Sequence, residues 1–471
     1  MANENSREKI VELLEKTNEK FINSELRPFL KIPSITLNHD GILKAKNFIM
    51  SYISDFCDEV MEYPGEVNPI IRAKITGNLK DTLLIYMMYD TQPINKEKEW
   101  MAPPFGAEIK VLLPPLDVLG DCIIARGAYN SKTPLLSFLN VVKNLKETNS
   151  LPLSLLLVFD GSEEMGSPDL LQFLRDNKKS LMGCTDAYYP SIKQDLSGNS
   201  ILKLGYKGIL SLIIIVSSKN KEPHSAFSAM IPNPANDLIF LLNELYSNNE
   251  FHIASLKKAY ELTEEENLII EELLNVLNLE EIKKKAGIVE TIEQDPKKVF
   301  VDYLFKPTFN ISTLKSGFLE EGTKNMVANK AQCNIDIRFP QEVTTDQIYE
   351  EIQEKVNKIK EKIRSHVQII KNMGYGSSRV KPDSIMVQSL VESAKLLNFK
   401  TIFWPISAAA APLSEIKRML GLDFLVGGLG IGGFAHAPNE FVQIDSILNT
   451  RLSYYYFLDS YAKHLNIGEN E

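Results

Sequence analysis

Four short polar stretches carry the residues of this chain that could do chemistry: MMYDTQP (87–93), ARGAYNSKT (125–133), FDGSEEMGS (159–167) and FAHAPNE (434–440). They hold aspartate, glutamate and histidine, which bind metal ions and transfer protons. Asp90 ends an apolar run, and Met88 stands two residues before it, although a metal site would want a histidine close by. Each stretch alone also fits a solvated loop, so their order and spacing must decide.

The elements that would position these stretches alternate between strands and helices. Residues 82–89 and LSLLLVFD (153–160) are continuous apolar runs, typical of strands buried on both faces, and KTPLLSFLNVVKNLK (132–146) reads as a helix. This alternation predicts a parallel sheet with helices on both faces. Ligands bind beyond the carboxyl ends of such strands, where Asp90 and GSEEMGS both fall.

The pattern changes after LGYKG (204–208). KAQCNIDIRF (330–339) alternates apolar and polar residues, which predicts an antiparallel strand with one buried face. A helix with a threonine cap follows it, and residues 255–298 read as added helices. The α/β pattern returns at a helix over 384–397 and a strand near 399–404. We predict an α/β domain formed by residues 1–207 and 379–471, with an α+β domain, residues 208–378, inserted into it.

Composition excludes several classes of protein. The chain has 471 residues, 44% apolar and 24% charged, and its net charge of −9 argues against nucleic acid as a partner. It has no apolar run of about 18 residues to cross a membrane, and its start lacks a signal peptide's apolar stretch. Its scattered cysteines, Cys57, Cys122, Cys184 and Cys333, form no CxxC pair, so we expect a cytoplasmic protein without disulfides or a cysteine zinc site.

Further stretches stand in order between and beside the four: WMAPPF (100–105), EPHSA (222–226), IPNPAND (231–237) and KNMVANKAQCNIDIRF (324–339). Together they resemble the motifs of the two-zinc peptidases and deacylases, the family of carnosinase, acetylornithine deacetylase, succinyl-diaminopimelate desuccinylase and bacterial dipeptidases. The resemblance runs over nearly the whole chain.

The resemblance implies a catalytic α/β domain with an inserted α+β lid domain that commonly dimerises, so we expect a homodimer through the lid. It implies hydrolysis of an amide bond in a peptide or an N-acyl amino acid. In the family, two zinc ions share a bridging carboxylate and activate a water, and a glutamate serves as general base. The lid supplies a histidine for the oxyanion and an arginine for the substrate carboxylate.

Several residues of this chain match the family's functional positions. Glu163 matches the general base, and Asp90 matches the aspartate that orients the first zinc-binding histidine. Glu164 and His436 match metal ligands. His224 and Arg338 match the lid residues for the oxyanion and the carboxylate, and Asn325 matches an asparagine on the substrate side.

Other positions depart from the family. The first histidine ligand is replaced by Met88, the bridging aspartate by Asn130, and no acid stands near Ser191 or Ile192, where another ligand should be. Thioether and amide groups are poor zinc ligands. A two-zinc centre is therefore not expected. We expect no metal, or one weakly bound divalent ion such as zinc, held by Asn130, Glu164 and His436. Ala408–Ala410 replace a Gly-Gly-Ser loop, which should narrow the approach to the substrate.

Two interpretations follow. In the first, hydrolysis is impaired or lost and the protein binds a peptide or amino-acid derivative. In the second, it is an active amide hydrolase with one metal and Glu163 as base, or with ligands aligned differently, such as Cys184, Asp186 or Asp195. Plainer alternatives are packing for Met88, a loop position for His224 and a surface ion pair beside Asp336 for Arg338.

Overall fold

The computed structural model describes residues 4–468, and the chain divides into two compact units. The first unit contains Met1–Leu204, Val380–Trp404 and Glu415–Glu471, and the inserted unit contains Gly205–Arg379 and Pro405–Ser414. The sequence analysis placed Pro405–Ser414 in the α/β domain. This segment groups instead with the inserted unit, where the backbone N of Lys207 donates to the carbonyls of Ser407 at 3.0 Å and Ala409 at 3.1 Å.

The first unit is built on a mixed sheet with the strand order β1-β2-β6-β3-β7-β18. Its strands are β1 (Glu59–Tyr63), β2 (Ile70–Ile75), β3 (Leu79–Met88), β6 (Leu153–Asp160), β7 (Cys184–Pro190) and β18 (Phe424–Gly427). Strands β6, β3, β7 and β18 are parallel, as predicted, but β2 runs antiparallel to both β1 and β6. The connection over residues 64–69 is too short for a crossover helix, so β1 and β2 pair as antiparallel neighbours.

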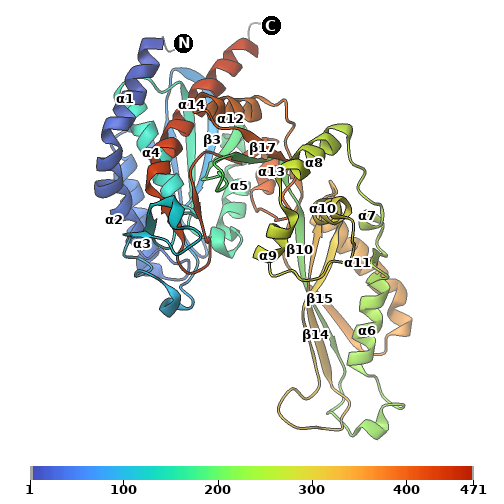
Figure 1. Cartoon of the computed structure of the whole chain (residues 1–471). Helices are drawn as coiled ribbons and strands as arrows, with labels where there is room; N and C mark the ends of the chain where they lie inside the picture. Colours follow the sequence, from blue (N-terminus) through green and yellow to red (C-terminus); the bar gives the residue numbers. More distant parts are fainter. Residues whose placement is uncertain (1–3, 469–471) are drawn as a thin grey trace. The chain divides into compact units, whose positions relative to one another are not determined.

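Helices from distant parts of the sequence cover this sheet. Helix α4 (Lys132–Glu147) contacts β3 and β7 and packs against α14 (Ile444–Gly468), and α5 (Pro168–Leu181) contacts β2. Helices α1 (Glu4–Phe21) and α14 lie side by side although they are at opposite ends of the chain (Figure 1). The buried Arg451 of α14 fixes this contact by donating to the carbonyl of Leu14 at 2.6 Å.

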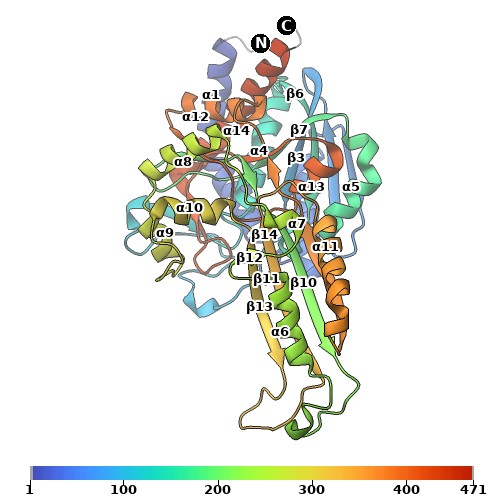
Figure 2. The same ribbon diagram turned by 90° about the vertical axis from the view of Figure 1, so that its right-hand side faces the viewer.

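The inserted unit is an antiparallel sheet with helices packed on one face. Its strand order is β13-β14-β10-β15, formed by β10 (Gly208–Ser217), β13 (Thr308–Ser316), β14 (Lys330–Phe339) and β15 (His366–Tyr375). Strand β14 alternates buried and partly exposed residues, as predicted. Its buried face packs with α6 (Pro234–Leu245) and α11 (Thr345–Ile359), and α6 lies along the strands in Figure 2. The chain segment that connects α6 to β13 forms four more helices: α7 (Ala254–Lys257), α8 (Glu264–Val276), α9 (Leu279–Lys285) and α10 (Pro296–Phe305).

The α/β catalytic-type domain with an inserted α+β domain is thus confirmed as the fold class. Within residues 4–468, no helix combines the length and the apolar character needed to span a membrane.

Candidate functional site

Asp90 ties two of the predicted stretches together at the carboxyl ends of β3 and β6. Its buried carboxylate accepts hydrogen bonds from Thr36 Oγ1 at 2.8 Å and from the backbone N of Glu163 at 3.2 Å and of Glu164 at 3.1 Å. Because β3 and β6 are parallel neighbours, their loops emerge at the same edge of the sheet. Asp90 therefore positions the two glutamates rather than a histidine.

Glu164 is the meeting point of the site. Its side chain is only 4% exposed. Its Oε2 accepts from Gln92 Nε2 at 2.8 Å, and its Oε1 accepts from Asn130 Nδ2 at 3.2 Å and lies 3.2 Å from His436 Nε2. Asn130 Nδ2 is also 3.1 Å from His436 Nε2. Three residues predicted to surround one metal thus converge, together with Gln92, which stands two positions after Asp90 but was not singled out.

A pair of short strands brings Asn130 and His436 together across some 300 residues of sequence. Strand β5 (Asp121–Ile124) pairs with β20 (Phe441–Gln443), so the loops that follow and precede them are neighbours. Glu440 fastens the two loops: it accepts from the backbone N of Tyr129 at 3.1 Å and of Asn130 at 2.8 Å, and it pairs with Arg126 at 2.7 Å. Both charged side chains are almost fully buried. Sequence reasoning missed this pair, although each member lies in a quoted stretch.

The carboxyl groups of the site are crowded. Burial, followed by the charges of Glu164 and Asp90, raises the pKa of Glu163 well above its ordinary value. Burial, followed by the charges of Asp160 and Glu164, does the same for the pKa of Asp90. The hydrogen bond to Glu164 raises the pKa of His436, which favours a charged imidazolium beside that carboxylate.

The structure buries two of the residues that stand at the family's metal-ligand positions. Met88 is 1% exposed and Ile192 is fully buried. The carboxylate of Asp195 lies in a turn, where it accepts hydrogen bonds from the backbone N of Ser197 and of Asn199 at 2.9 Å each. Within residues 4–468, no group of three or more histidine, cysteine, aspartate or glutamate side chains is arranged to hold a metal ion.

The other two residues considered as alternative metal ligands, Cys184 and Asp186, lie away from Glu164. Cys184 and Asp186 are at the amino end of β7, whereas ligands are expected beyond its carboxyl end at Pro190. Asp186 accepts a hydrogen bond from Tyr461 of α14 at 2.6 Å. The structure therefore does not bring these residues to Glu164.

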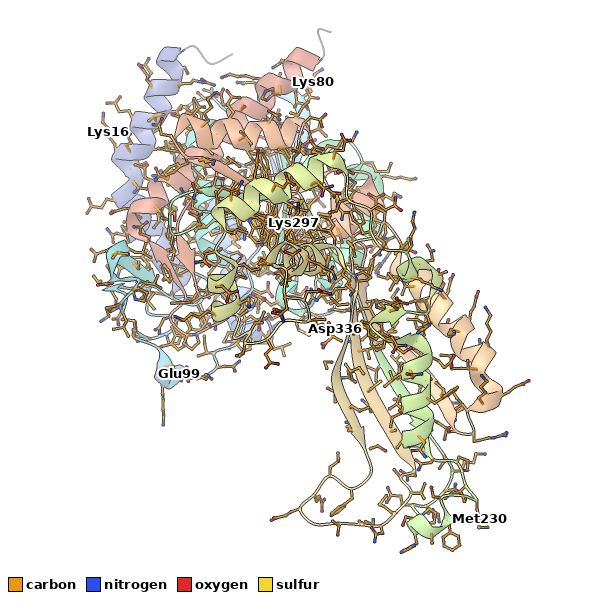
Figure 3. All side chains as sticks on the ribbon, turned by 45° about the vertical axis from the view of Figure 1, so that its right-hand side comes forward. Lys16, Lys80, Glu99, Met230, Lys297 and Asp336 are labelled. Carbon is orange, nitrogen blue, oxygen red and sulfur yellow. The ribbon has the colours of Figure 1, made fainter. Side chains whose placement is uncertain are left out.

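The predicted lid residues fall at opposite ends of the inserted sheet. The backbone N of Ser225 donates to Asn325 O at 3.1 Å, so exposed His224 and Asn325 lie together beyond one end of β10. In the register of β10 and β14, Ser217 is opposite Lys330 at the end near His224, and Ile209 is opposite Arg338 at the other end. Eight residues of extended strand span about 27 Å. Figure 3 shows the same separation, with Met230 at the far tip and Asp336 near the other end. Arg338 Nε is 3.9 Å from Asp336 Oδ1.

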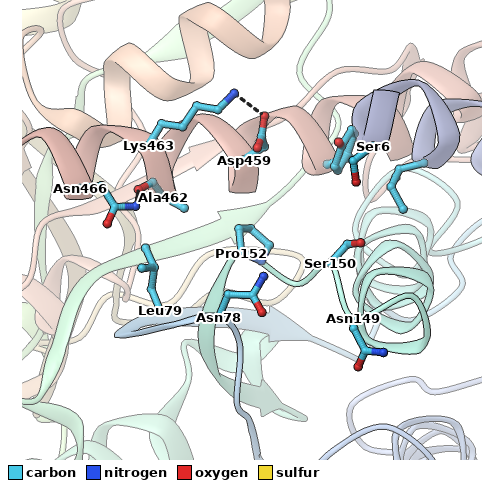
Figure 4. Close-up of a pocket in the computed structure, with 12 residues that line it drawn as sticks. Ser6, Asn78, Leu79, Asn149, Ser150, Pro152, Asp459, Ala462, Lys463 and Asn466 are labelled. Carbon is cyan, nitrogen blue, oxygen red and sulfur yellow. Dashed lines mark hydrogen bonds and ion pairs between the residues drawn. The ribbon is translucent and has the colours of Figure 1, made fainter. Parts of the chain in front are cut away.

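A cavity in the first unit lies away from this site. It has a volume of about 210 Å³ and is found where β3 and β6 begin, between α1 and α14. Figure 4 shows its lining of polar and apolar side chains, in which Asp459 is paired with Lys463 at 2.8 Å. It contains none of the predicted site residues.

The chain is similar to a known protein family over most of its length. Residues 84–460 match the model of peptidase family M20/M25/M40. The Cys-Gly metallodipeptidase dug1 of Schizosaccharomyces pombe is 24% identical over 94% of this chain and 96% of its own.

Solved structures agree. The M20 family metallo-carboxypeptidase Sso-CP2 of Sulfolobus solfataricus superimposes with a TM-score of 0.81 at 27% identity, covering 93% of this chain and 98% of its own. The di-peptidase Dug1p of Saccharomyces cerevisiae shares the fold with a TM-score of 0.76 at 19% identity, covering 98% and 99%. On these matches, the chain belongs to peptidase family M20/M25/M40.

Proposed function

We propose that this member of the peptidase family has a degenerate two-zinc centre, and that it binds a peptide or N-acyl amino acid without efficient hydrolysis. One observation carries the proposal. The carboxylate of Glu164 accepts hydrogen bonds from two neutral amides, Gln92 at 2.8 Å and Asn130 at 3.2 Å. Both oxygens of this carboxylate are thus hydrogen-bonded by N–H groups of the chain, and the imidazole of His436, whose pKa is raised, supplies a positive charge beside it.

The donors at the place of the first zinc ion do not fit zinc. Zinc takes thiolate, imidazole and carboxylate ligands, whereas Met88 offers a buried thioether and Asn130 a neutral amide. At the third ligand place, near Ser191 or Ile192, no acid stands, and Ile192 is buried. All of these changes affect ligands of the same zinc ion, which supports the loss of that whole zinc site.

The donors at the second place fit in part. Glu164 and His436 are suitable ligands, but an amide at Asn130 cannot supply the negative charge of a bridging carboxylate. A single metal here would supply Lewis acidity to a bound carbonyl. The chain's own groups would orient the substrate, and Glu163 would have to accept a proton from water. Burial and the charges of Glu164 and Asp90 raise the pKa of Glu163 well above its ordinary value, and a cation bound beside it would lower that pKa again.

A second candidate, an active one-metal amide hydrolase with Glu163 as base, is favoured by one observation. Asn130, Glu164 and His436 converge within 3.2 Å of one another. The relatives' names point to dipeptides as the ligand class for either function.

The distribution of the substrate-side residues favours a homodimer. Within one chain, Arg338 and the His224–Asn325 pair are separated by about 27 Å of strand, too far for one dipeptide to contact both. A second copy would let a single ligand meet both kinds of residue. We therefore propose that the ligand site is complete only in the dimer.

Metal content and turnover test the two candidates. We expect the purified protein to hold well under one zinc per chain by elemental analysis, and to cleave neither dipeptides nor N-acyl amino acids with added Zn²⁺, Mn²⁺ or Co²⁺. Metal-dependent turnover that disappears in Glu163→Ala would overturn the binding function. One metal per chain that is lost in His436→Ala would establish the one-metal enzyme.

A repaired variant is the matched test of the scaffold. Met88→His, Asn130→Asp and Ser191→Asp together return zinc-binding groups to three positions, with the third at partly exposed Ser191 rather than at buried Ile192. We expect this triple variant to retain zinc after dialysis while the wild type does not. Equal zinc content in the two would argue that the loss lies elsewhere.

A further inference from the structure

Two lysines of the first unit lie side by side beyond β7. The backbone N of Ile201, in β8 (Ser200–Lys203), donates to Lys193 O at 2.7 Å, and Gln194 forms an antiparallel bridge with Ser200. In this register Lys193 is opposite residue 201. Lys203 is then its diagonal neighbour on the same face, at a typical separation of about 7–8 Å that long side chains easily close.

Each ammonium group lies against an aromatic ring. Lys193 Nζ is 5.8 Å from the ring centre of Tyr129, and Lys203 Nζ is 5.7 Å from that of Trp404. Trp404 belongs to β17 (Thr401–Trp404) and is the direct register partner of Lys203. The rings hold the two cations in place, and each such contact contributes about 0.5–2 kcal/mol.

Among the side chains that the structure describes, neither cation has an anionic partner. Within residues 4–468, no carboxylate lies within ion-pair distance of Lys193 or Lys203, although both side chains are half-buried. Burial lowers the pKa of Lys193 to about 8, and burial together with the charge of Lys193 lowers the pKa of Lys203 to about 8. Two like charges that share a poorly solvated place are unfavourable unless an anion joins them.

We propose that Lys193 and Lys203 form a binding site for the phosphate group of a small molecule. Two ammonium groups match the two charges of a phosphate dianion. Their point-like donors suit the tetrahedral oxygens of a phosphate, whereas planar carboxylates are matched best by the fork of an arginine. The phosphates of nucleic acid fit less well, because the chain carries a net charge of −9.

The site adjoins the candidate functional site without depending on its chemistry. Tyr129, which supports Lys193, directly precedes Asn130 in the chain. Phosphate binding here is therefore expected whether or not the protein cleaves peptides, and its test requires no metal.

Titration calorimetry of the full chain with inorganic phosphate at pH 7 tests the site. We expect one phosphate per chain, with affinity reduced at least tenfold in Lys193→Gln and in Lys203→Gln. Lys400→Gln is the matched control, because Lys400 is exposed and lies one residue before β17. It should bind like the wild type.

Further arms distinguish the class of ligand from a general salt effect. Titration with sodium chloride at equal ionic strength should release no heat of binding. Succinate should bind more weakly than phosphate. Thermal unfolding without phosphate should show a cooperative transition for both glutamine variants, so that a loss of phosphate binding is not a loss of the fold. The proposal is overturned if the wild type binds no phosphate, if succinate binds more tightly, or if both glutamine variants bind phosphate with unchanged affinity.

Discussion

At the scale of the residue, Asn130 decides the character of the candidate site, because its amide donates to Glu164 where the family would place a second carboxylate. We predict that Asn130→Asp lowers the free energy of unfolding by about 1–3 kcal/mol in the presence of EDTA, since a hydrogen-bond donor is lost and two carboxylates are brought together. Urea denaturation measures this loss, and added zinc should recover part of it.

Asn95→Asp is the control for the added charge, because Asn95 is exposed. Its unfolding free energy should change by less than about 0.5 kcal/mol. If Asn130→Asp were as stable as the wild type in EDTA, the amide contact with Glu164 would have no energetic role.

Asp186 gives the molecule a pH dependence of known sign. Burial raises its pKa to about 6 from an ordinary 3.8, although Tyr461 donates to it. The folded state therefore binds the proton more tightly, so this contribution to stability is fully present below about pH 4 and is lost as the pH rises through about 6. The loss is at most about 3 kcal/mol.

Urea unfolding of the wild type and of Asp186→Asn at intervals from pH 4 to pH 7 isolates this group. We expect the stability of the wild type relative to Asp186→Asn to fall over that range. Asp117→Asn, at an exposed position, should follow the wild type at every pH. A constant difference between wild type and Asp186→Asn would contradict the assignment.

The sequence predicted the acids of the site but not what holds them. Asp90, Glu163, Glu164 and His436 stand in motifs whose spacing can be read directly. The donors to Glu164 come from Gln92 and Asn130, 72 and 34 residues away, and Arg126 pairs with Glu440 across 314 residues. One sequence carries no signal for such contacts. The neutral side chains of Met88 and Asn130 could be read directly, because residue type is a property of the sequence alone.

At the scale of the element, the Arg126–Glu440 pair joins the loops that β5 and β20 bring together, at 2.7 Å with both side chains at most 1% exposed. We predict that Glu440→Gln costs about 3–5 kcal/mol of unfolding free energy, because it leaves the guanidinium buried without its counter-ion. Urea denaturation measures this cost.

A double-mutant cycle completes that test. Arg126→Met with Glu440→Gln should cost less than the sum of the single changes, since neither charge is then left alone. Glu99→Gln breaks the exposed pair with Lys96 and should cost less than about 1 kcal/mol. Additive losses in the buried pair would show that the two residues act independently.

Elements with a strong pattern were predictable, and strand direction was not. β6 and β14 have the predicted bounds, 153–160 and 330–339, because a buried run and a strict alternation each identify a strand. β2 runs against its neighbour β6 because its direction follows from short connections, not from its own residues. The same limit applies to Pro405–Ser414, whose partner is Lys207 in the inserted unit.

At the scale of the whole molecule, the inserted unit has a surface suited to a second copy. Strand β13 is at the edge of its sheet in the described chain, with Ile311 41% and Leu314 57% exposed. These side chains form an apolar groove with Ile239 and Leu242 of α6. An exposed apolar edge strand pairs readily with another chain, and a two-fold axis would cover both copies of the groove at once.

We predict that the wild type sediments as a dimer and that Leu314→Asp shifts it to monomer, with the dimer dissociation constant raised at least about 100-fold, because a charge placed in an apolar interface loses its water. Val289→Asp is the control, since Val289 is 89% exposed in the inserted unit but does not line this groove; it should remain dimeric. Sedimentation equilibrium distinguishes the outcomes. If Leu314→Asp stays dimeric at micromolar concentration, the dimer uses another surface. If the wild type is itself monomeric, His224 and Arg338 cannot serve one small ligand, and the ligand must then be a longer peptide.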